Sequence, residues 1–407
     1  MDRGRTLKLD DVVATTPTSR DRVMDFFRAA SIVVVVFGHW LIGVIWWRGG
    51  KIGTVSAIGL TGWLWIATWF LQVIPLFFFV GGFANYVGYQ SFRRQGRSVG
   101  SFLGSRAVRL LKPTLVFVIV WAVVEVILHL ADLGGTGLLR GVRPPGATVP
   151  FGPLWFLAVY FVVVMASPVT LWLHRRFDLA IPIALSVGAI VVDVVRFGAH
   201  VEWIGQANIW LVFLLPHQLG YFYAEGRLAK LPKAVFVAMA LVGVATMVAL
   251  TNLYRFFPGI SVYPRSLLGT DVGRITNTNP PTLMMLAMAI WSIGAAMLAR
   301  PLLARWLERA RVWEAVVFTN TIVMTLFLWH MSAYLIAVLL LWPLGLGQQG
   351  DTNASWWIER PIWELVPAVF LVGLLILFGR FERPRLAAAP ARAVPITPNA
   401  QAHTGQR

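Results

Sequence analysis

The chain of 407 residues contains no cysteine and few charged residues. The absence of cysteine excludes disulfide bonds, thiolate metal sites and a cysteine nucleophile. Charged residues make up only 13% of the chain, whereas 57% of residues are hydrophobic, and the mean hydropathy is +0.70. A water-soluble protein of this length would need more charge to cover its surface. The composition therefore favours a protein that lies largely within a membrane.

Acidic residues are scarce as well, with 18 Asp and Glu against 35 Lys and Arg and a formal net charge of +17. A basic excess of this size is also found in nucleic-acid-binding proteins. Here, however, the basic residues occur in short segments between long apolar runs, as the positive-inside rule describes. The 19 tryptophans suit the interfaces of a bilayer. We therefore expect a lipid bilayer, and no nucleic acid, as a partner.

Apolar runs of roughly 20 residues, the length that crosses a bilayer core of about 30 Å, recur along the whole chain. They predict an all-α, polytopic membrane bundle of about ten transmembrane helices. The expected spans are Met24–Trp47, Gly62–Tyr86 with a kink at Pro75, Pro113–Leu133, Leu154–Leu173, Leu179–Phe197, Ala207–Ala224, Ala234–Leu253, Thr282–Ala299, Ala315–Trp342 and Ile362–Phe378.

The placement of Lys and Arg predicts the orientation of the bundle. Most of the 35 basic residues fall on one side of the membrane when the N-terminus is cytoplasmic, and an even number of spans places the C-terminus there too. The expected location is the inner (plasma) membrane. The chain then divides into a cytoplasmic tail (1–20), a transmembrane domain (21–381) and a disordered cytoplasmic tail rich in Ala and Pro (382–407).

Ionisable groups inside a span are costly, so each is a hypothesis of function. The first span carries two of them, Arg28 and His39, eleven positions apart. At about 100° and 1.5 Å per residue they lie within roughly 20° of one face and about 16 Å apart along the axis. We expect Arg28 at the cytoplasmic boundary and His39 near the midplane, facing a common cavity. A structural histidine bonded to a neighbouring helix is the alternative for His39.

The segment from Arg28 to His39 resembles the arginine–ten residues–histidine signature of the membrane acyltransferase-3 family. Three more segments resemble motifs of that family in the same order. They are Pro75–Phe83 in the second span, the Arg-x-x-Arg element at Ser105–Pro113, and the late helix Leu326–His330. Gly152–Leu157 also resembles the family's Leu-Trp-Phe element. One departure is Gly81-Gly82-Phe83, where the family usually has Ser-Gly-Phe. The resemblance covers about residues 21–381.

The resemblance implies an integral membrane O-acyltransferase. Its donor would be an acyl-CoA, in the first place acetyl-CoA, bound from the cytoplasm, and its acceptor a hydroxyl of a cell-envelope glycan or glycolipid. Arg106 and Arg109, three apart on a helix, together with Arg28, would bind the phosphates of coenzyme A, because guanidinium groups donate two hydrogen bonds at once. His39 would be the general base. His330 would orient the acceptor or hydrogen-bond His39, and a purely structural hydrogen bond is an equal alternative.

The chain is also similar overall to the mycobacterial branch of this family, whose acceptors include trehalose mycolates such as trehalose monomycolate. Whether an envelope-lipid exporter is a partner stays open. No metal site is expected, because the intramembrane histidines lie on separate spans. Asp193 and Arg196 are expected to pair within one helix. The rival functions are a lipid or solute transporter without acyl transfer, and a scaffold subunit without catalysis.

Overall fold

The computed structural model describes residues 20–48, 51–131, 149–253, 263–269, 276–347 and 350–382, so most of both predicted tails lies outside the described residues. Within these ranges the chain is mostly helical, and its two strands form one antiparallel hairpin, β1 (Gly43–Arg48) with β2 (Lys51–Ser56). Eight helical segments are long and apolar enough to cross a membrane, and nine if a bent helix pair counts as one span. The predicted all-α membrane fold is confirmed.

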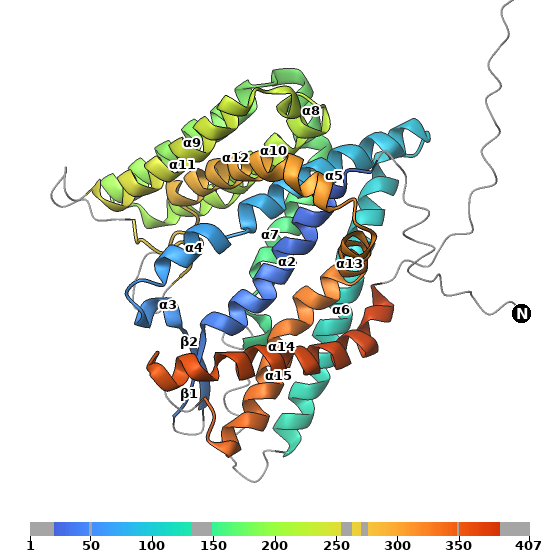
Figure 1. The fold of residues 1–407 in the computed structure, drawn as a ribbon. Coiled ribbons are helices and arrows are strands. Elements are labelled where there is room, and N and C mark those ends of the chain that lie inside the picture. Colours follow the sequence, from blue (N-terminus) through green and yellow to red (C-terminus); the bar gives the residue numbers. More distant parts are fainter. Residues whose placement is uncertain are drawn as a thin grey trace, which may run out of the picture.

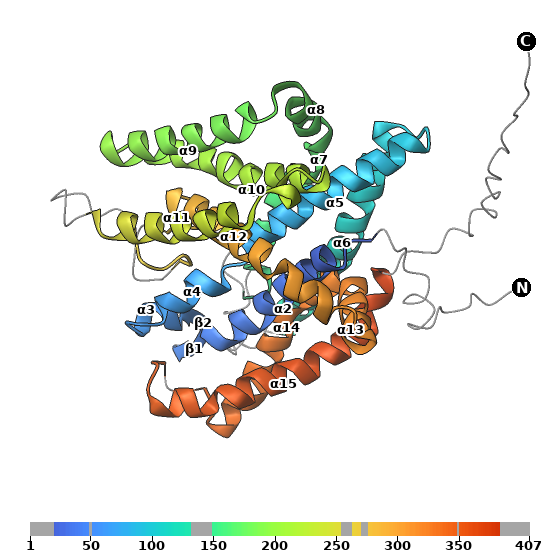
Figure 2. The same ribbon diagram turned by 45° about the horizontal axis from the view of Figure 1, so that its top comes forward.

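The helices pack into one bundle (Figure 1). In chain order they are α2 (Arg22–Ile42), α3 (Ala57–Leu60), α4 (Trp65–Leu71), α5 (Ile74–Arg94), α6 (Val99–Ala131), α7 (Leu154–Met165), α8 (Ser167–Phe177), α9 (Ala180–Gly198), α10 (Asn208–Ala224), α11 (Lys233–Thr251), α12 (Leu283–Trp306), α13 (Ala310–Thr321), α14 (Val323–Leu341) and α15 (Ala354–Phe378). α2 and α5 lie in the middle, with α9 to α12 on one side and α13 to α15 on the other (Figure 2).

α10 has 17 residues, at the lower limit for a span. Its first residue, Asn208, donates a hydrogen bond to Asp193 near the end of α9. The residue after its last turn, Glu225, forms an ion pair with His174 at the end of α8. α10 therefore runs between the same two ends of the bundle as its neighbours. α10 is not among the eight or nine segments that are long and apolar enough to cross, so the tenth predicted span stays a prediction.

The first span differs from its prediction, because α2 ends at Ile42 and the expected continuation to Trp47 belongs to β1. The run from Val44 to Trp47 is apolar without a period, so it does not distinguish a helix from a strand. The change of direction occurs at Gly43, where an added Cβ would lie 2.6 Å from the Tyr334 hydroxyl. That hydroxyl donates a 2.9 Å hydrogen bond to the Gly43 carbonyl and fixes the turn.

Three other expected spans are interrupted. The second breaks at Gln72 and Val73, just before the predicted kink at Pro75, and Pro75 occupies the first turn of α5, where its missing N–H leaves no hydrogen bond unmade. The fourth is the pair α7 and α8, bent by 56°. The ninth divides at Ile322 into α13 and α14. Glu382 caps α14, because its carboxylate accepts 2.8 Å hydrogen bonds from two backbone N–H groups of the first turn.

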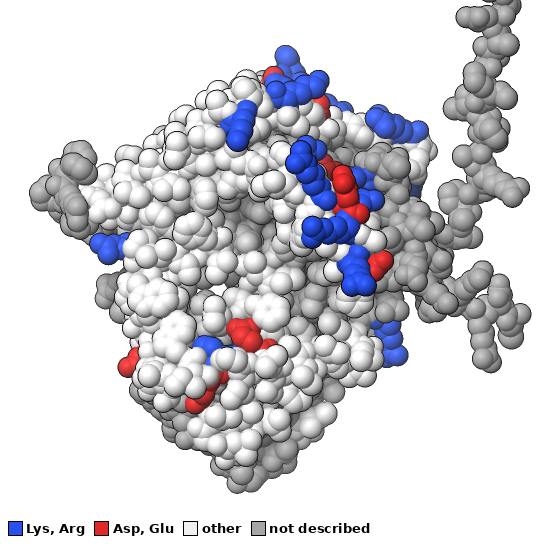
Figure 3. Space-filling view, viewed as in Figure 1, with Lys and Arg blue, Asp and Glu red and all other residues white. Residues whose placement is uncertain are grey.

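Both ends of the described chain lie at one end of the bundle. Arg22, at the start of α2, donates to the carbonyl of Leu307, and Glu382, at the end of the described chain, binds the start of α14. Lys and Arg gather along this edge, where α5, α8 and α12 end (Figure 3). We call this the arginine end, and the opposite one, with β1 and β2, the hairpin end. That the arginine end is cytoplasmic stays a prediction.

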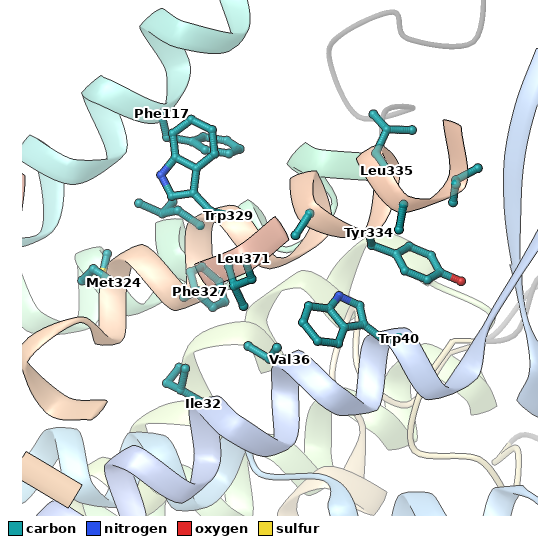
Figure 4. Close-up of a cluster of buried hydrophobic side chains, with 14 of the residues drawn as sticks. Ile32, Val36, Trp40, Phe117, Met324, Phe327, Trp329, Tyr334, Leu335 and Leu371 are labelled. Carbon is teal, nitrogen blue, oxygen red and sulfur yellow. The ribbon is translucent and has the colours of Figure 1, made fainter. Parts of the chain in front are cut away.

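α14 is the most buried of the membrane-crossing helices described, with 78% of its span inside the protein. It packs between α2, α6 and α15 around a cluster of buried side chains that includes Val36, Trp40, Phe117 and Trp329 (Figure 4). The Trp40 indole donates a 3.0 Å hydrogen bond to the carbonyl of His330. This contact holds α2 and α14 in register, and these are the two helices that carry the candidate histidines.

Candidate active site

His39 lies in the last turn of α2, and its imidazole orientation is fixed by its own helix. Its Nδ1 is 2.7 Å from the carbonyl oxygen of Val35. A carbonyl only accepts hydrogen bonds, so Nδ1 carries the proton and Nε2 of the neutral ring holds a free lone pair. The side chain lines a cavity of about 400 Å³. His39 therefore presents a proton acceptor to a space that a small substrate group fits.

This space, the histidine cavity, lies toward the hairpin end between α2, α4, α5 and α7, and residues 268–269 and 276–279 also contribute to its lining. Most of its walls are apolar. Its polar side chains, besides His39, are Ser31, Thr68, Gln72, Thr276, Thr278 and Asn279. In ligand-binding cavities that are mostly apolar, a few polar groups fix the orientation of the ligand.

His330 lies beside His39, at a distance of 5.1 Å between the ring centroids. It is fully buried, and its Nδ1 is 2.7 Å from the carbonyl oxygen of Phe327, so its proton is placed as in His39. Among the described residues its Nε2 has no hydrogen-bond partner. The alternative in which His330 hydrogen-bonds His39 is wrong, because Nδ1 of His330 faces the Phe327 carbonyl and its Nε2 is unpaired among the described residues, while its contribution to a reaction stays a hypothesis. His330 is not among the residues that line the histidine cavity, but its ring contacts two that are, His39 and Phe327.

Arg28, Arg106 and Arg109 line a second, smaller space of about 70 Å³ toward the arginine end, the arginine cavity. No Asp or Glu is among its lining residues. Hydrogen bonds to neighbouring residues fix the side chains of Arg28 and Arg106. Arg28 donates to the Asn320 amide oxygen at 2.6 Å and to Asp25 at 3.0 Å, and Arg106 donates to the carbonyl of Ala84 at 2.9 Å. Three guanidinium groups around one space form an anion site.

The expectation that Arg28 and His39 face a common cavity is wrong in this structure. They line two adjoining cavities, which share the walls formed by Ile32, Phe77, Phe156 and Phe327. Both residues do lie on the inner face of α2, as their spacing predicts. The sequence could not reveal the aromatic layer between them, because its members come from four separate helices.

Two residues that sequence reasoning missed support the arginine cavity. Asn320, at the end of α13, positions the Arg28 guanidinium, and it also donates to the carbonyl of Asp25 at 2.9 Å. Tyr160 lines the cavity one turn after Phe156, on the same face of α7. The spacing of Phe156 and Tyr160 was the available signal for the tyrosine. For Asn320 the signal was an amide inside an apolar run.

Tyr160 also explains the departure at Gly81. A Cβ added there would lie 2.9 Å from the Tyr160 ring and 3.1 Å from its hydroxyl oxygen. A serine at position 81 would therefore crowd the tyrosine. In this chain the Tyr160 side chain fills the space into which a side chain at position 81 would project.

Other polar groups of the spans have structural partners. The predicted pair of Asp193 and Arg196 is wrong, since Arg196 pairs with Glu202 at 3.0 Å. Asp193 instead accepts hydrogen bonds from Asn208 and from the backbone of Leu283, both at 2.8 Å. Among the residues with described coordinates, no group of three His, Cys, Asp or Glu could hold a metal ion.

A bundle of membrane-crossing helices that encloses ionisable side chains beside a cavity is typical of a functional site in a membrane protein. Residues 21–379 match the family model of an acyltransferase domain, the acyltransferase-3 family, and the chain belongs to that family. No curated protein and no solved structure matches the chain. The family favours a membrane acyltransferase over the transporter and scaffold alternatives.

Proposed function

We propose that the protein transfers a short acyl group, first of all acetyl, from acyl-coenzyme A to a hydroxyl of a cell-envelope glycan or glycolipid. The acceptor to test first is trehalose monomycolate, which rests on the overall resemblance alone. We also propose that the arginine end faces the cytoplasm, where acyl-coenzyme A is present, and that the membrane is the inner one.

The donor would bind through its phosphates in the arginine cavity. Arg106 and Arg109 follow one another on the same face of α6, and Arg28 faces them from α2. Phosphate oxygens accept paired hydrogen bonds from guanidinium groups, and such charge-assisted bonds are roughly twice as strong as neutral ones. The absence of Asp and Glu from the lining supports an anionic ligand.

His39 would act as the general base in direct transfer. Its Nε2 takes the proton of the acceptor hydroxyl while the oxygen attacks the thioester carbonyl. The new C–O bond forms, the C–S bond breaks, and the proton passes from His39 to the sulfur of the departing coenzyme A. His330, with its ring against His39, would keep the imidazole in place through the step. This makes His330 a positioning residue.

The observation that carries this function is the pairing of two features. One is the tautomer of His39, which its hydrogen bond to Val35 fixes with Nε2 unprotonated, in a ring that lines the histidine cavity. The other is the adjoining anion site with three guanidinium groups. A transporter without acyl transfer would need no site for the phosphates of an acyl donor.

The test uses purified protein in nanodiscs with radiolabelled acetyl-coenzyme A and a lipid extract as acceptor. His39→Gln removes the base and keeps an amide of similar size, so we expect the rate to fall about 10²- to 10⁴-fold. His174→Gln is the matched control, because His174 is also buried and lies outside both cavities. Equal rates in the wild type and His39→Gln would remove His39 from the mechanism. Flux of lipid without labelled product would support transport.

A further inference from the structure

The walls shared by the two cavities form one layer across the middle of the bundle. Ile32 of α2, Phe77 of α5, Phe156 of α7 and Phe327 of α14 line both spaces. The ring centroids of Phe77 and Phe156 are 5.3 Å apart, and those of Phe156 and Phe327 are 5.7 Å apart. These contacts are within the range of packed aromatic pairs. We call these four residues the aromatic layer.

The position of the layer follows from α2. Ile32 lies one turn after Arg28 and two turns before His39, on the same face of the helix. Phosphates that bind Arg28 are therefore on one side of Ile32, and a proton acceptor is on the other side. An apolar layer strongly disfavours charged groups, so the nucleotide of a donor cannot follow its acyl group across.

We propose that the aromatic layer is the selectivity barrier of the donor path. This inference rests on the proposed function. The narrow, uncharged pantetheine arm threads between Phe77, Phe156 and Phe327 and delivers the thioester to His39. A bulky acyl group such as benzoyl would have to displace these packed rings further than acetyl does, so the layer favours small acyl groups. Without donor, the packed rings separate the two cavities.

The first test measures the barrier without any acyl transfer. The chain has no cysteine, so a single introduced cysteine gives labelling without background. Ala84→Cys places a thiol in the arginine cavity and Ala67→Cys places one in the histidine cavity. Each is combined with Phe156→Ala, or with Phe213→Ala as control. Phe213 is fully buried against Phe78 and lines neither cavity.

A charged thiol reagent is then added at the hairpin end of protein oriented in vesicles. We expect Ala67→Cys to react and Ala84→Cys to be protected. Phe156→Ala should increase labelling of Ala84→Cys at least about tenfold, whereas Phe213→Ala should leave it protected. The proposal is overturned if, with no second substitution, Ala84→Cys reacts as fast as Ala67→Cys, or if Ala67→Cys does not react. It is also overturned if Phe156→Ala and Phe213→Ala give equal labelling of Ala84→Cys.

The second test measures selectivity. Removing the Phe156 ring leaves a space that suits a benzoyl group, and shape differences of this kind change specificity by about 10- to 200-fold. We expect Phe156→Ala to raise kcat/KM for benzoyl-coenzyme A relative to acetyl-coenzyme A at least tenfold, and Phe213→Ala to leave the ratio unchanged. An unchanged ratio in Phe156→Ala contradicts the selectivity role. If the wild type transfers no acyl group, the proposed function fails, while the labelling result still decides whether the layer is a barrier.

Discussion

His39 and His330 have the same hydrogen-bonding arrangement and different surroundings. Each donates Nδ1–H to a carbonyl of its own helix, which leaves Nε2 unprotonated in the neutral ring. The His39 ring lines a cavity, and the His330 ring is fully buried behind it. Of the two, only His39 lines the cavity, which supports the proposal that His39 is the base and His330 a positioning residue.

The arginines of the Arg-x-x-Arg element give a prediction at the same scale. Arg106→Gln or Arg109→Gln should raise KM for acetyl-coenzyme A about 10- to 100-fold, because one hydrogen bond to a charged group contributes about 1.5–3 kcal/mol. An acetyl thioester that lacks the nucleotide should be used equally well by variant and wild type. Steady-state kinetics with both donors measures this.

Arg93→Gln is the control for the arginine variants, since Arg93 is exposed and lines neither cavity. It should leave KM for both donors unchanged. Arginine variants that weaken the truncated donor as much as acetyl-coenzyme A would show that the guanidinium groups do not bind the nucleotide.

The helices α5 and α10 are in close backbone contact at two glycines, Gly82 and Gly220. A Cβ on Gly82 would lie 2.0 Å from the carbonyl oxygen of His217, and one on Gly220 would lie 2.2 Å from that of Phe79. Both obstacles are backbone atoms, which cannot rotate away. Small residues that let two backbones come close are typical of helix packing in membranes. The second-helix motif therefore sets the distance between α5 and α10.

Gly82→Ala should destabilise the fold by about 2 kcal/mol or more, because it forces the two backbones apart. Gly104→Ala is the matched control on α6, where an added Cβ meets nothing within 4 Å. It should be neutral or stabilise by up to about 1 kcal/mol through helix propensity. Thermal unfolding in detergent compares the two variants. Equal transition temperatures would show that α5 and α10 do not depend on this contact.

The breaks within the spans show what the apolar pattern could and could not predict. Length and hydropathy place the crossings, because a helix must satisfy its own backbone in lipid. The hairpin after Ile42 was missed, since it depends on Tyr334, nearly 300 residues away, contacting Gly43. The break at Ile322 was missed as well. It follows Asn320, whose amide contacts Arg28 and Asp25 nearly 300 residues earlier in the chain, and such contacts are not visible in the sequence.

For the molecule as a whole, the arginine end predicts the orientation. Ser98→Cys, exposed between α5 and α6, should react with an impermeant thiol reagent from the cytoplasmic side only. Asp351→Cys, exposed at the hairpin end before α15, should react from the opposite side only. Labelling of intact cells and of inverted vesicles measures both. The reverse result would place the anion site outside the cell and away from its proposed donor.

The candidate site shows the same division between pattern and contact. Arg28, His39, Arg106 and Arg109 could be predicted, because motif and spacing mark them on single helices. The separation of their cavities could not, since Phe77, Phe156 and Phe327 come together only when three distant helices pack. The sequence therefore indicates the arginines and the histidine, and the structure adds the aromatic layer that lies between them.

The central claim is that one donor spans both cavities. The most direct measurement is an experimental structure of the protein with a non-hydrolysable thioether analogue of acetyl-coenzyme A. We predict its phosphates within hydrogen-bond distance of Arg106 and Arg109, its arm between Phe77 and Phe156, and its acyl carbon beside Nε2 of His39. A nucleotide bound at the hairpin end, or an acyl carbon that stays on the arginine side of the layer, would contradict the account.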